Sequence, residues 1–131
     1  MSVKKRVMLV DDDADFVEMN KAVLEQNGYE VEVAYNAKEC LEKALANEPD
    51  LIVLDAMMSG SADGFNVSCD LRNFERTKQI PLIMVTAINE TLPFRFKPDA
   101  TWLPVDMLIE KPVRPEQLLQ VIKRALAQTQ A

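Results

Sequence analysis

The sequence contains no histidine, and this absence excludes several kinds of chemistry. Without an imidazole there can be no serine–histidine or cysteine–histidine nucleophile pair and no histidine-ligated zinc. No histidine is available to carry a phosphoryl group either. Any chemistry on this chain must therefore use carboxylate, hydroxyl and lysine side chains.

Cysteine and long apolar runs are also scarce. Cys40 and Cys69 form no CxxC pair, so the sequence predicts two small buried side chains in a reducing compartment rather than a metal or redox site. No apolar run approaches the roughly 18 residues of a membrane span, and the N-terminal SVKKRV lacks the apolar stretch of a signal peptide. We therefore expect a cytoplasmic protein that does not bind membranes.

Basic residues are fewer than acidic ones, 15 against 21, which gives a formal net charge of −6. Direct binding to nucleic acid or to an anionic membrane needs a basic face, so this balance argues against both and favours cations or basic partners. The length of 131 residues and a hydrophobic content of 48% fit one domain with a proper core. We therefore expect a single domain over residues 1–131.

Short apolar runs alternate with segments of helical spacing along the chain. Each run is too short for a buried helix, and most are bounded by charged, proline or turn residues. The runs that are apolar throughout are residues 7–10, 51–54, 82–85 and 107–109. Such strands belong in a parallel sheet that is covered on both faces.

Another strand is predicted over residues 29–34, where apolar residues alternate with charged ones and only one side can be buried, as in an edge strand. The apolar residues at helical spacing are Phe16, Met19 and Val23, then Leu41, Ala44 and Leu45, and finally Leu118, Ile122, Ala125 and Leu126. Right-handed crossovers then give an α/β fold with a doubly wound, five-stranded parallel sheet in the order 2-1-3-4-5.

Cap residues support these helix boundaries. Gly28 is expected to stop the first helix, and Asn36 with Glu39 resembles a capping box for the second. Pro115 stands where a last helix would begin. Asp13 is expected at the N-terminal end of the first helix, where negative charge is favoured.

Three consecutive aspartates follow the first apolar run. Two unit charges about 4 Å apart repel by about 1 kcal/mol in water and about 4 kcal/mol near a protein surface, so the cluster needs a cation. In a doubly wound sheet the ligand site lies at the carboxyl ends of the strands, near the first and third. Asp11 and Asp12 follow the first strand and Asp55 the third, which predicts an oxygen-ligand site suited to Mg²⁺.

Thr86 and Lys111 follow the fourth and fifth apolar runs, so both should reach the same edge of the sheet. A carboxylate that touches Mg²⁺ can act as a nucleophile towards phosphorus. Phosphoryl transfer needs mainly positioning and neutralisation of charge, which Mg²⁺, an ammonium and a hydroxyl can supply without histidine.

The motifs VDDD, LIVLD, VTA and EKP, in this order, resemble the receiver domain of bacterial two-component response regulators. The resemblance covers nearly the whole chain, from Lys5 to about Ala127. It implies a flavodoxin-like, CheY-like fold, Mg²⁺ as the cofactor, and a histidine kinase or phosphotransfer protein as the phosphodonor. It therefore implies a signalling switch rather than an enzyme with a separate substrate.

The same resemblance assigns roles to individual residues. Asp55 would accept the phosphoryl group, Thr86 would donate a hydrogen bond to it, and Lys111 would pair with it. The residues that the resemblance assigns to Mg²⁺ are Asp11, Asp12, Asp55 and, through its backbone carbonyl, Met57.

The chain also departs from the family pattern. Pro93, Pro98 and Pro104 lie where the fourth helix of the family would be, so we expect that helix to be irregular over residues 89–105. One alternative is therefore a degenerate receiver that binds a partner without being phosphorylated. A haloacid-dehalogenase-like phosphatase would need a second aspartate where this chain has Met57, and a flavin binder would need a hydroxyl- and glycine-rich loop after the first strand.

Overall fold

The computed structural model describes residues 4–55, 63–87, 107–111 and 113–129. Strands and helices alternate along most of this part of the chain. They are β1 (Arg6–Val10), α1 (Ala14–Gln26), β2 (Glu30–Ala34), α2 (Ala37–Asn47), β3 (Leu51–Asp55), α3 (Asp63–Arg72), β4 (Leu82–Ala87), β5 (Met107–Lys111) and α4 (Pro115–Thr129).

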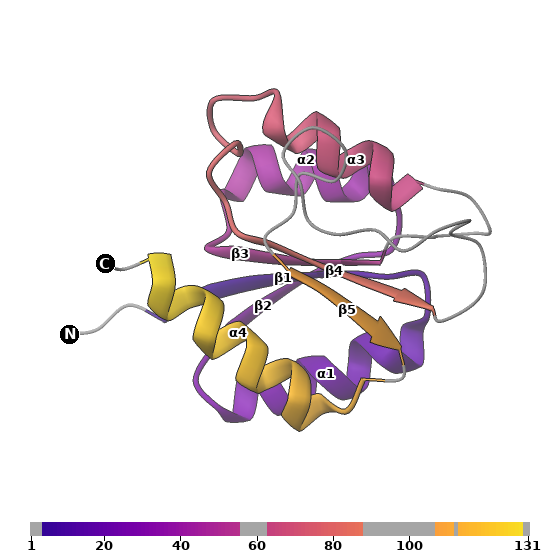
Figure 1. Cartoon of the computed structure of the whole chain (residues 1–131), viewed down its shortest axis with the longest axis vertical. Helices are drawn as coiled ribbons and strands as arrows, with labels where there is room; N and C mark the ends of the chain where they lie inside the picture. Colours follow the sequence, from indigo (N-terminus) through magenta and orange to yellow (C-terminus); the bar gives the residue numbers. More distant parts are fainter. Residues whose placement is uncertain (1–3, 56–62, 88–106, 112, 130–131) are drawn as a thin grey trace.

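The five strands form one parallel sheet in the order β2-β1-β3-β4-β5. Helices α2 and α3 cover one face of the sheet, and α1 and α4 cover the other (Figure 1). The predicted fold class and strand order are confirmed. The sequence also predicted an irregular helix over residues 89–105, between the fourth and fifth strands. This segment, which is distinct from α4, lies outside the described residues.

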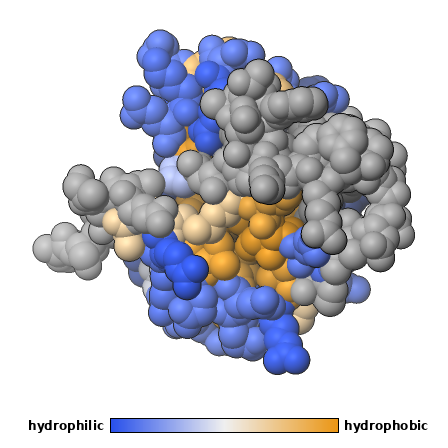
Figure 2. Space-filling view, in the orientation of Figure 1, coloured by the Kyte–Doolittle hydropathy of each residue, from blue (hydrophilic) through white to orange (hydrophobic). Residues whose placement is uncertain are grey.

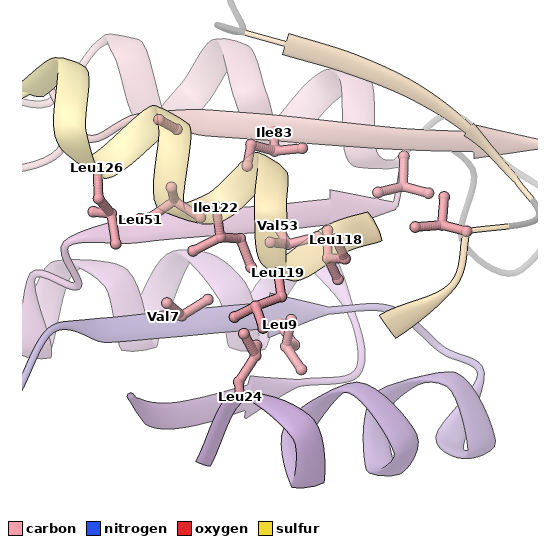
Figure 3. Close-up of a cluster of buried hydrophobic side chains, with 13 residues drawn as sticks. Val7, Leu9, Leu24, Leu51, Val53, Ile83, Leu118, Leu119, Ile122 and Leu126 are labelled. Atoms are coloured by element: carbon pink, nitrogen blue, oxygen red, sulfur yellow. The ribbon is translucent and has the colours of Figure 1, made fainter. Parts of the chain in front are cut away.

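Alternate residues of each central strand enter two separate hydrophobic clusters. In β1, Met8 and Val10 point towards α2 and α3, whereas Val7 and Leu9 point towards α1 and α4. Figure 3 shows the second cluster, in which side chains of α1 and α4 meet those of the sheet. Full burial of one such side chain stabilises a fold by about 1.5–3 kcal/mol, so the two clusters together hold the three layers.

The two edges of the sheet are less deeply buried than its centre. The residues of β2 are mostly part-buried, as its alternation of charged and apolar residues predicts. Residues Met107, Leu108 and Ile109 of β5 are also only part-buried. Figure 2 shows hydrophilic residues around the helical layers and a hydrophobic area between them.

Side-chain caps fix where the first two helices begin. The Asp13 side chain accepts hydrogen bonds from the backbone N–H groups of Asp15 and Phe16, at 3.1 and 3.3 Å. The Asn36 side chain accepts from the N–H of Glu39 at 2.8 Å. Each cap satisfies N–H groups that have no partner inside the helix. The predicted roles of Asp13 and Asn36 as caps are confirmed.

The other predicted boundaries also agree with the structure. Helix α1 ends at Gln26, and Gly28 follows with φ of +92°, a conformation that glycine adopts without steric cost. Helix α4 begins at Pro115, whose fixed φ suits the first helical position. No helix among the described residues is both long and apolar enough to cross a membrane.

The prediction of the buried face of α1 was partly wrong. The side chains that α1 buries are Val17, Asn20 and Leu24, whereas the Met19 side chain is 51% exposed. One residue corresponds to a rotation of about 100° around a helix, so a small shift of the apolar stripe moves Met19 to the solvent side. The amide of Asn20 takes a core position instead.

The buried amide of Asn20 generates a prediction about stability. Its Nδ2 donates to the backbone carbonyl of Phe16 at 2.7 Å, but among the described residues its Oδ1 has no hydrogen-bond partner. A buried acceptor without a partner is unfavourable, so Asn20→Leu should raise the free energy of unfolding by about 1 kcal/mol in urea titrations. Asn27→Leu is the control, because Asn27 makes the same bond to Val23 at an exposed position. A less stable Asn20→Leu protein would contradict this prediction.

The two cysteines differ, which corrects the prediction that both are buried. Cys40 is fully buried in α2, whereas Cys69 lies on the exposed side of α3. Burial raises the pKa of the Cys40 thiol to about 12, so almost no reactive thiolate forms at neutral pH.

We expect a thiol reagent to modify the folded protein once, at Cys69, and the unfolded protein twice. Mass spectrometry checks this, and folded Cys69→Ser should stay unmodified; rapid modification of that variant would show that Cys40 is accessible.

Candidate functional site

The strand register brings the predicted acidic residues to one edge of the sheet. In the pairing of β1 with β3, Val10 lies opposite Leu54, so the residues that follow, Asp11 and Asp55, are neighbours at the carboxyl ends of the two strands. The backbone N–H of Asp11 donates to the carbonyl of Ala34 at 3.1 Å, which fixes the start of the loop after β1.

Three carboxylates meet at this edge. Asp11, Asp12 and Asp55 each offer a carboxylate oxygen, and these oxygens lie within 4.8 Å of one another. Asp11 and Asp55 are buried, with 1% and 6% of their surface exposed, whereas Asp12 is exposed. Charges in a partly buried site repel one another more strongly than in water, so this arrangement requires positive charge nearby.

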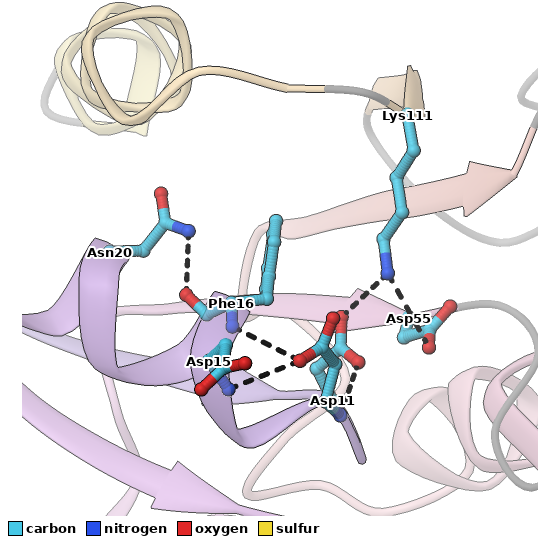
Figure 4. A network of polar contacts seen from close by, with 7 residues as sticks. Asp11, Asp15, Phe16, Asn20, Asp55 and Lys111 are labelled. Atoms are coloured by element: carbon cyan, nitrogen blue, oxygen red, sulfur yellow. Dashed lines mark hydrogen bonds and ion pairs between the residues drawn. The ribbon is translucent and has the colours of Figure 1, made fainter.

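Lys111, the last residue of β5, supplies one positive charge. Its Nζ donates to Asp11 Oδ2 at 2.9 Å and lies 3.9 Å from Asp55 Oδ2 (Figure 4). Burial alone would lower the pKa of Lys111, but the hydrogen bond and the attraction of Asp11, Asp55 and Asp13 raise it above its ordinary value. Lys111 therefore stays charged at neutral pH. The ammonium carries one positive charge, whereas the three carboxylates together carry three negative charges.

The loop between β1 and α1 orients Asp11 as well as capping the helix. Asp11 Oδ1 accepts a hydrogen bond from the backbone N–H of Asp13 at 2.9 Å, while Oδ2 faces Lys111. Asp13 in turn caps α1, so the acidic loop and the helix begin as one hydrogen-bonded unit. Each oxygen of Asp11 has a donor, which offsets part of the cost of burying this carboxylate.

Of the other two predicted site residues, the structure describes the backbone position of Thr86 but not Met57. The backbone of Thr86 lies in β4, one residue beyond Val85, which pairs with Asp55, and Thr86 itself pairs with Glu110 of β5. Thr86 is therefore at the same edge of the sheet as the acidic residues. Met57 lies outside the described residues.

Sequence reasoning missed one neighbour of the site. The Lys111 ammonium lies off the face of the ring of Phe16, a residue in the first turn of α1, with Nζ 4.7 Å from the ring centroid (Figure 4). An aromatic residue soon after the aspartates was the available signal, but its helical spacing suggested a role in the core alone.

Comparison with known sequences identifies relatives of the chain. The model of the response regulator receiver domain family matches residues 7–123. The phosphate regulon transcriptional regulatory protein PhoB of Pseudomonas aeruginosa is 35% identical over 127 residues, which are 97% of this chain and 54% of PhoB. The alkaline phosphatase synthesis transcriptional regulatory protein PhoP of Bacillus subtilis is 32% identical over 128 residues, 98% of this chain and 51% of PhoP. The chain thus spans about half the length of these curated relatives.

Solved structures share the fold. A CheY-like response regulator receiver domain protein from Methanospirillum hungatei superposes with a TM-score of 0.81 at 28% identity, covering 98% of each chain. The chemotaxis response regulator CheY4 of Vibrio cholerae gives a TM-score of 0.78 at 28% identity, covering 94% of this chain and 99% of CheY4. Because the family model spans most of the sequence and the fold superposes on these structures, the chain belongs to the response regulator receiver domain family.

Proposed function

We propose that Asp55 accepts a phosphoryl group in a reaction that depends on Mg²⁺, and that the domain thereby acts as a signalling switch. The main support for this proposal is that the carboxylates of Asp11, Asp12 and Asp55 lie close together beside the Lys111 ammonium. Thr86, at the same edge of the sheet, would donate a hydrogen bond from its hydroxyl to the phosphoryl group. Family membership favours this function over the phosphatase and flavin-binding alternatives.

The chemistry of the donor set fits Mg²⁺. Carboxylate oxygens are hard ligands, and Mg²⁺ usually takes one or two of them and keeps waters and a phosphate oxygen in its shell. Asp11, Asp12 and Asp55 supply such oxygens, two of them from buried residues and one from an exposed residue. We assign the metal to Asp11, Asp12 and Asp55, with the backbone carbonyl of Met57 as a further ligand. When bound, Mg²⁺ would neutralise negative charge on the phosphoryl oxygens.

The roles of the protein side chains follow from the charges. A carboxylate oxygen of Asp55 would form a bond to phosphorus while the bond from phosphorus to the donor breaks, and the donor leaves with that electron pair. Lys111 already lies 3.9 Å from Asp55 and carries a positive charge, so it would pair with the phosphoryl oxygens as their charge spreads. Asp11, hydrogen-bonded to Lys111, would keep the ammonium directed into the site.

The partners of the domain are proposed from its family. The phosphodonor would be a histidine kinase or phosphotransfer protein, whose histidine supplies the imidazole that this sequence lacks. The names of PhoB and PhoP describe transcriptional regulators, and the chain spans about half of each. The acidic balance still predicts that this domain does not contact nucleic acid directly. We propose that residues 1–131 form a single receiver domain.

The first test of the proposed function is chemical phosphorylation. With Mg²⁺ and acetyl phosphate, the wild-type protein should gain one phosphoryl group, and Asp55→Asn should gain none, because an amide is a poor nucleophile towards phosphorus. Intact-mass spectrometry measures both. Asp50→Asn is a matched control at the opposite end of β3, where Asp50 accepts a hydrogen bond from the backbone N–H of Arg6, and it should be labelled like the wild type. Labelling of Asp55→Asn, or of no protein, would contradict the proposal, and the second result would favour a degenerate receiver.

The second test concerns the metal. Asp12→Asn should weaken Mg²⁺ binding at least about tenfold, because it removes one charged ligand, while the metal-free protein should be as stable as the wild type or more stable, because repulsion falls. Calorimetric titration measures the affinity. Saturation at about 100 times the dissociation constant should stabilise the wild type by about 2.7 kcal/mol.

Asp15→Asn provides the matched control for the metal test. Asp15 is an exposed carboxylate in the first turn of α1 and does not belong to the cluster of Asp11, Asp12 and Asp55. We expect the Mg²⁺ affinity of Asp15→Asn to stay within about twofold of the wild type, since a solvent-screened charge outside the cluster adds little to binding. Equal loss in Asp12→Asn and Asp15→Asn would mean that the general acidity of the region, not a defined site, attracts the ion.

A further inference from the structure

The contact between Phe16 and Lys111 links the first turn of α1 to the end of β5. The Lys111 ammonium lies 4.7 Å from the centroid of the Phe16 ring, within the range of about 6 Å in which a cation is attracted to an aromatic face. We propose that Phe16 is a positioning residue for Lys111, and that its ring helps to hold the ammonium beside Asp11 and Asp55. This inference rests on the proposed function, because it names a further residue that the phosphoryl site would use.

Lys111 needs such support because of its place in the fold. It is the last residue of β5, an edge strand, whereas Asp11 and Asp55 lie at the ends of the interior strands β1 and β3. The ammonium must therefore reach inwards on a flexible four-carbon stem, and 26% of the side chain is exposed to solvent. A lysine side chain loses substantial rotamer freedom when it is held in one conformation. Among the described residues, its hydrogen bond to Asp11 at 2.9 Å and its longer ion pair with Asp55 at 3.9 Å hold it on the acidic side.

Phe16 is well placed to supply a second contact because its own backbone is fixed at both ends. Its N–H donates to the side chain of Asp13 at 3.3 Å, and its carbonyl accepts from the buried amide of Asn20 at 2.7 Å. Asp13 also donates its N–H to Asp11, so the ring and the Asp11 carboxylate belong to the same hydrogen-bonded turn. Carboxylate and ring thus approach the ammonium from one hydrogen-bonded turn, and Figure 4 shows Asp11, Phe16 and Lys111 together.

The plainer explanation is that Phe16 only packs against the core, and it does contact the cluster beneath α1 and α4. The two explanations differ in what they require of the side chain. Packing needs an apolar group of suitable volume, which leucine or methionine can provide. Attraction of a cation needs the electron-rich face of an aromatic ring, which tyrosine keeps and leucine lacks. The aromatic and aliphatic variants therefore separate the two explanations.

The kinetic experiment compares phosphorylation by acetyl phosphate at saturating Mg²⁺. We expect Phe16→Leu to react about two- to fivefold more slowly than the wild type, and Phe16→Tyr to react at the wild-type rate. Tyr29→Leu is the matched control, because Tyr29 packs against the same cluster but precedes β2, at the opposite edge of the sheet from Lys111. Its rate should equal that of the wild type. Phe16→Met replaces Phe16→Leu if circular dichroism shows that the leucine variant is unfolded.

A spectroscopic experiment tests the contact itself without any phosphorylation. In protein with ¹³C-labelled lysine, the ring current of Phe16 should move the ε-CH₂ proton signal of Lys111 upfield. The signal is assigned by its loss in Lys111→Met. It should keep this position in Phe16→Tyr and Tyr29→Leu and return to the ordinary lysine position in Phe16→Leu.

The outcomes separate this inference from the proposed function. An unchanged Lys111 signal in Phe16→Leu, equal rates for Phe16→Leu and the wild type, or equal slowing in Phe16→Leu and Phe16→Tyr would each overturn the positioning role. If the wild type accepts no phosphoryl group, the proposed function fails, and with it the functional half of this inference, whatever the Lys111 signal shows.

Discussion

Carboxylate oxygens of Asp11, Asp12 and Asp55 lie within 4.8 Å of one another, directly after the apolar runs of residues 7–10 and 51–54. Their mutual repulsion opposes folding, and the rest of the site can be understood as a response to it. Lys111 supplies one positive charge, and the backbone N–H of Asp13 donates to Asp11. These contacts reduce the repulsion without removing it. The Mg²⁺ that we propose for this site would neutralise further charge, as phosphoryl transfer to a carboxylate would need.

The parallel sheet explains how such a cluster can exist at all. Residues 7–10 of β1 and 51–54 of β3 are fully or almost fully buried, so two hydrophobic clusters hold these strands whatever the charge at their ends. Because Val10 pairs with Leu54, the carboxylates of the residues that follow them are neighbours. Burial of many apolar side chains, each worth about 1.5–3 kcal/mol, offsets a local repulsion of a few kcal/mol.

The predictions made from the sequence were correct where a residue type has one dominant structural role. Short runs of apolar residues predicted the interior strands, and the side chains of Asp13 and Asn36 cap helices because they can accept from free N–H groups. It failed where the answer depends on helix rotation or on partners distant in sequence. Met19 and Cys69 are apolar by type, but each lies on the outer side of its helix. Such positions follow from packing between layers, which local spacing specifies only to within a residue.

The contact of Phe16 with Lys111 shows why the periphery of a site is harder to predict than its centre. The two residues are far apart in sequence, and neither spacing nor charge pattern pairs them. Lys111 lies on the edge strand β5, whereas the carboxylates follow the central strands, so the ammonium is the link between the acidic cluster and the edge of the sheet. Additional negative charge on Asp55 would strengthen the pull of that carboxylate on Lys111 relative to the pull of Asp11. The position of the ammonium, and with it the end of β5, would therefore respond to the chemical state of Asp55, and a ring fixed to the start of α1 would limit how far the ammonium can move.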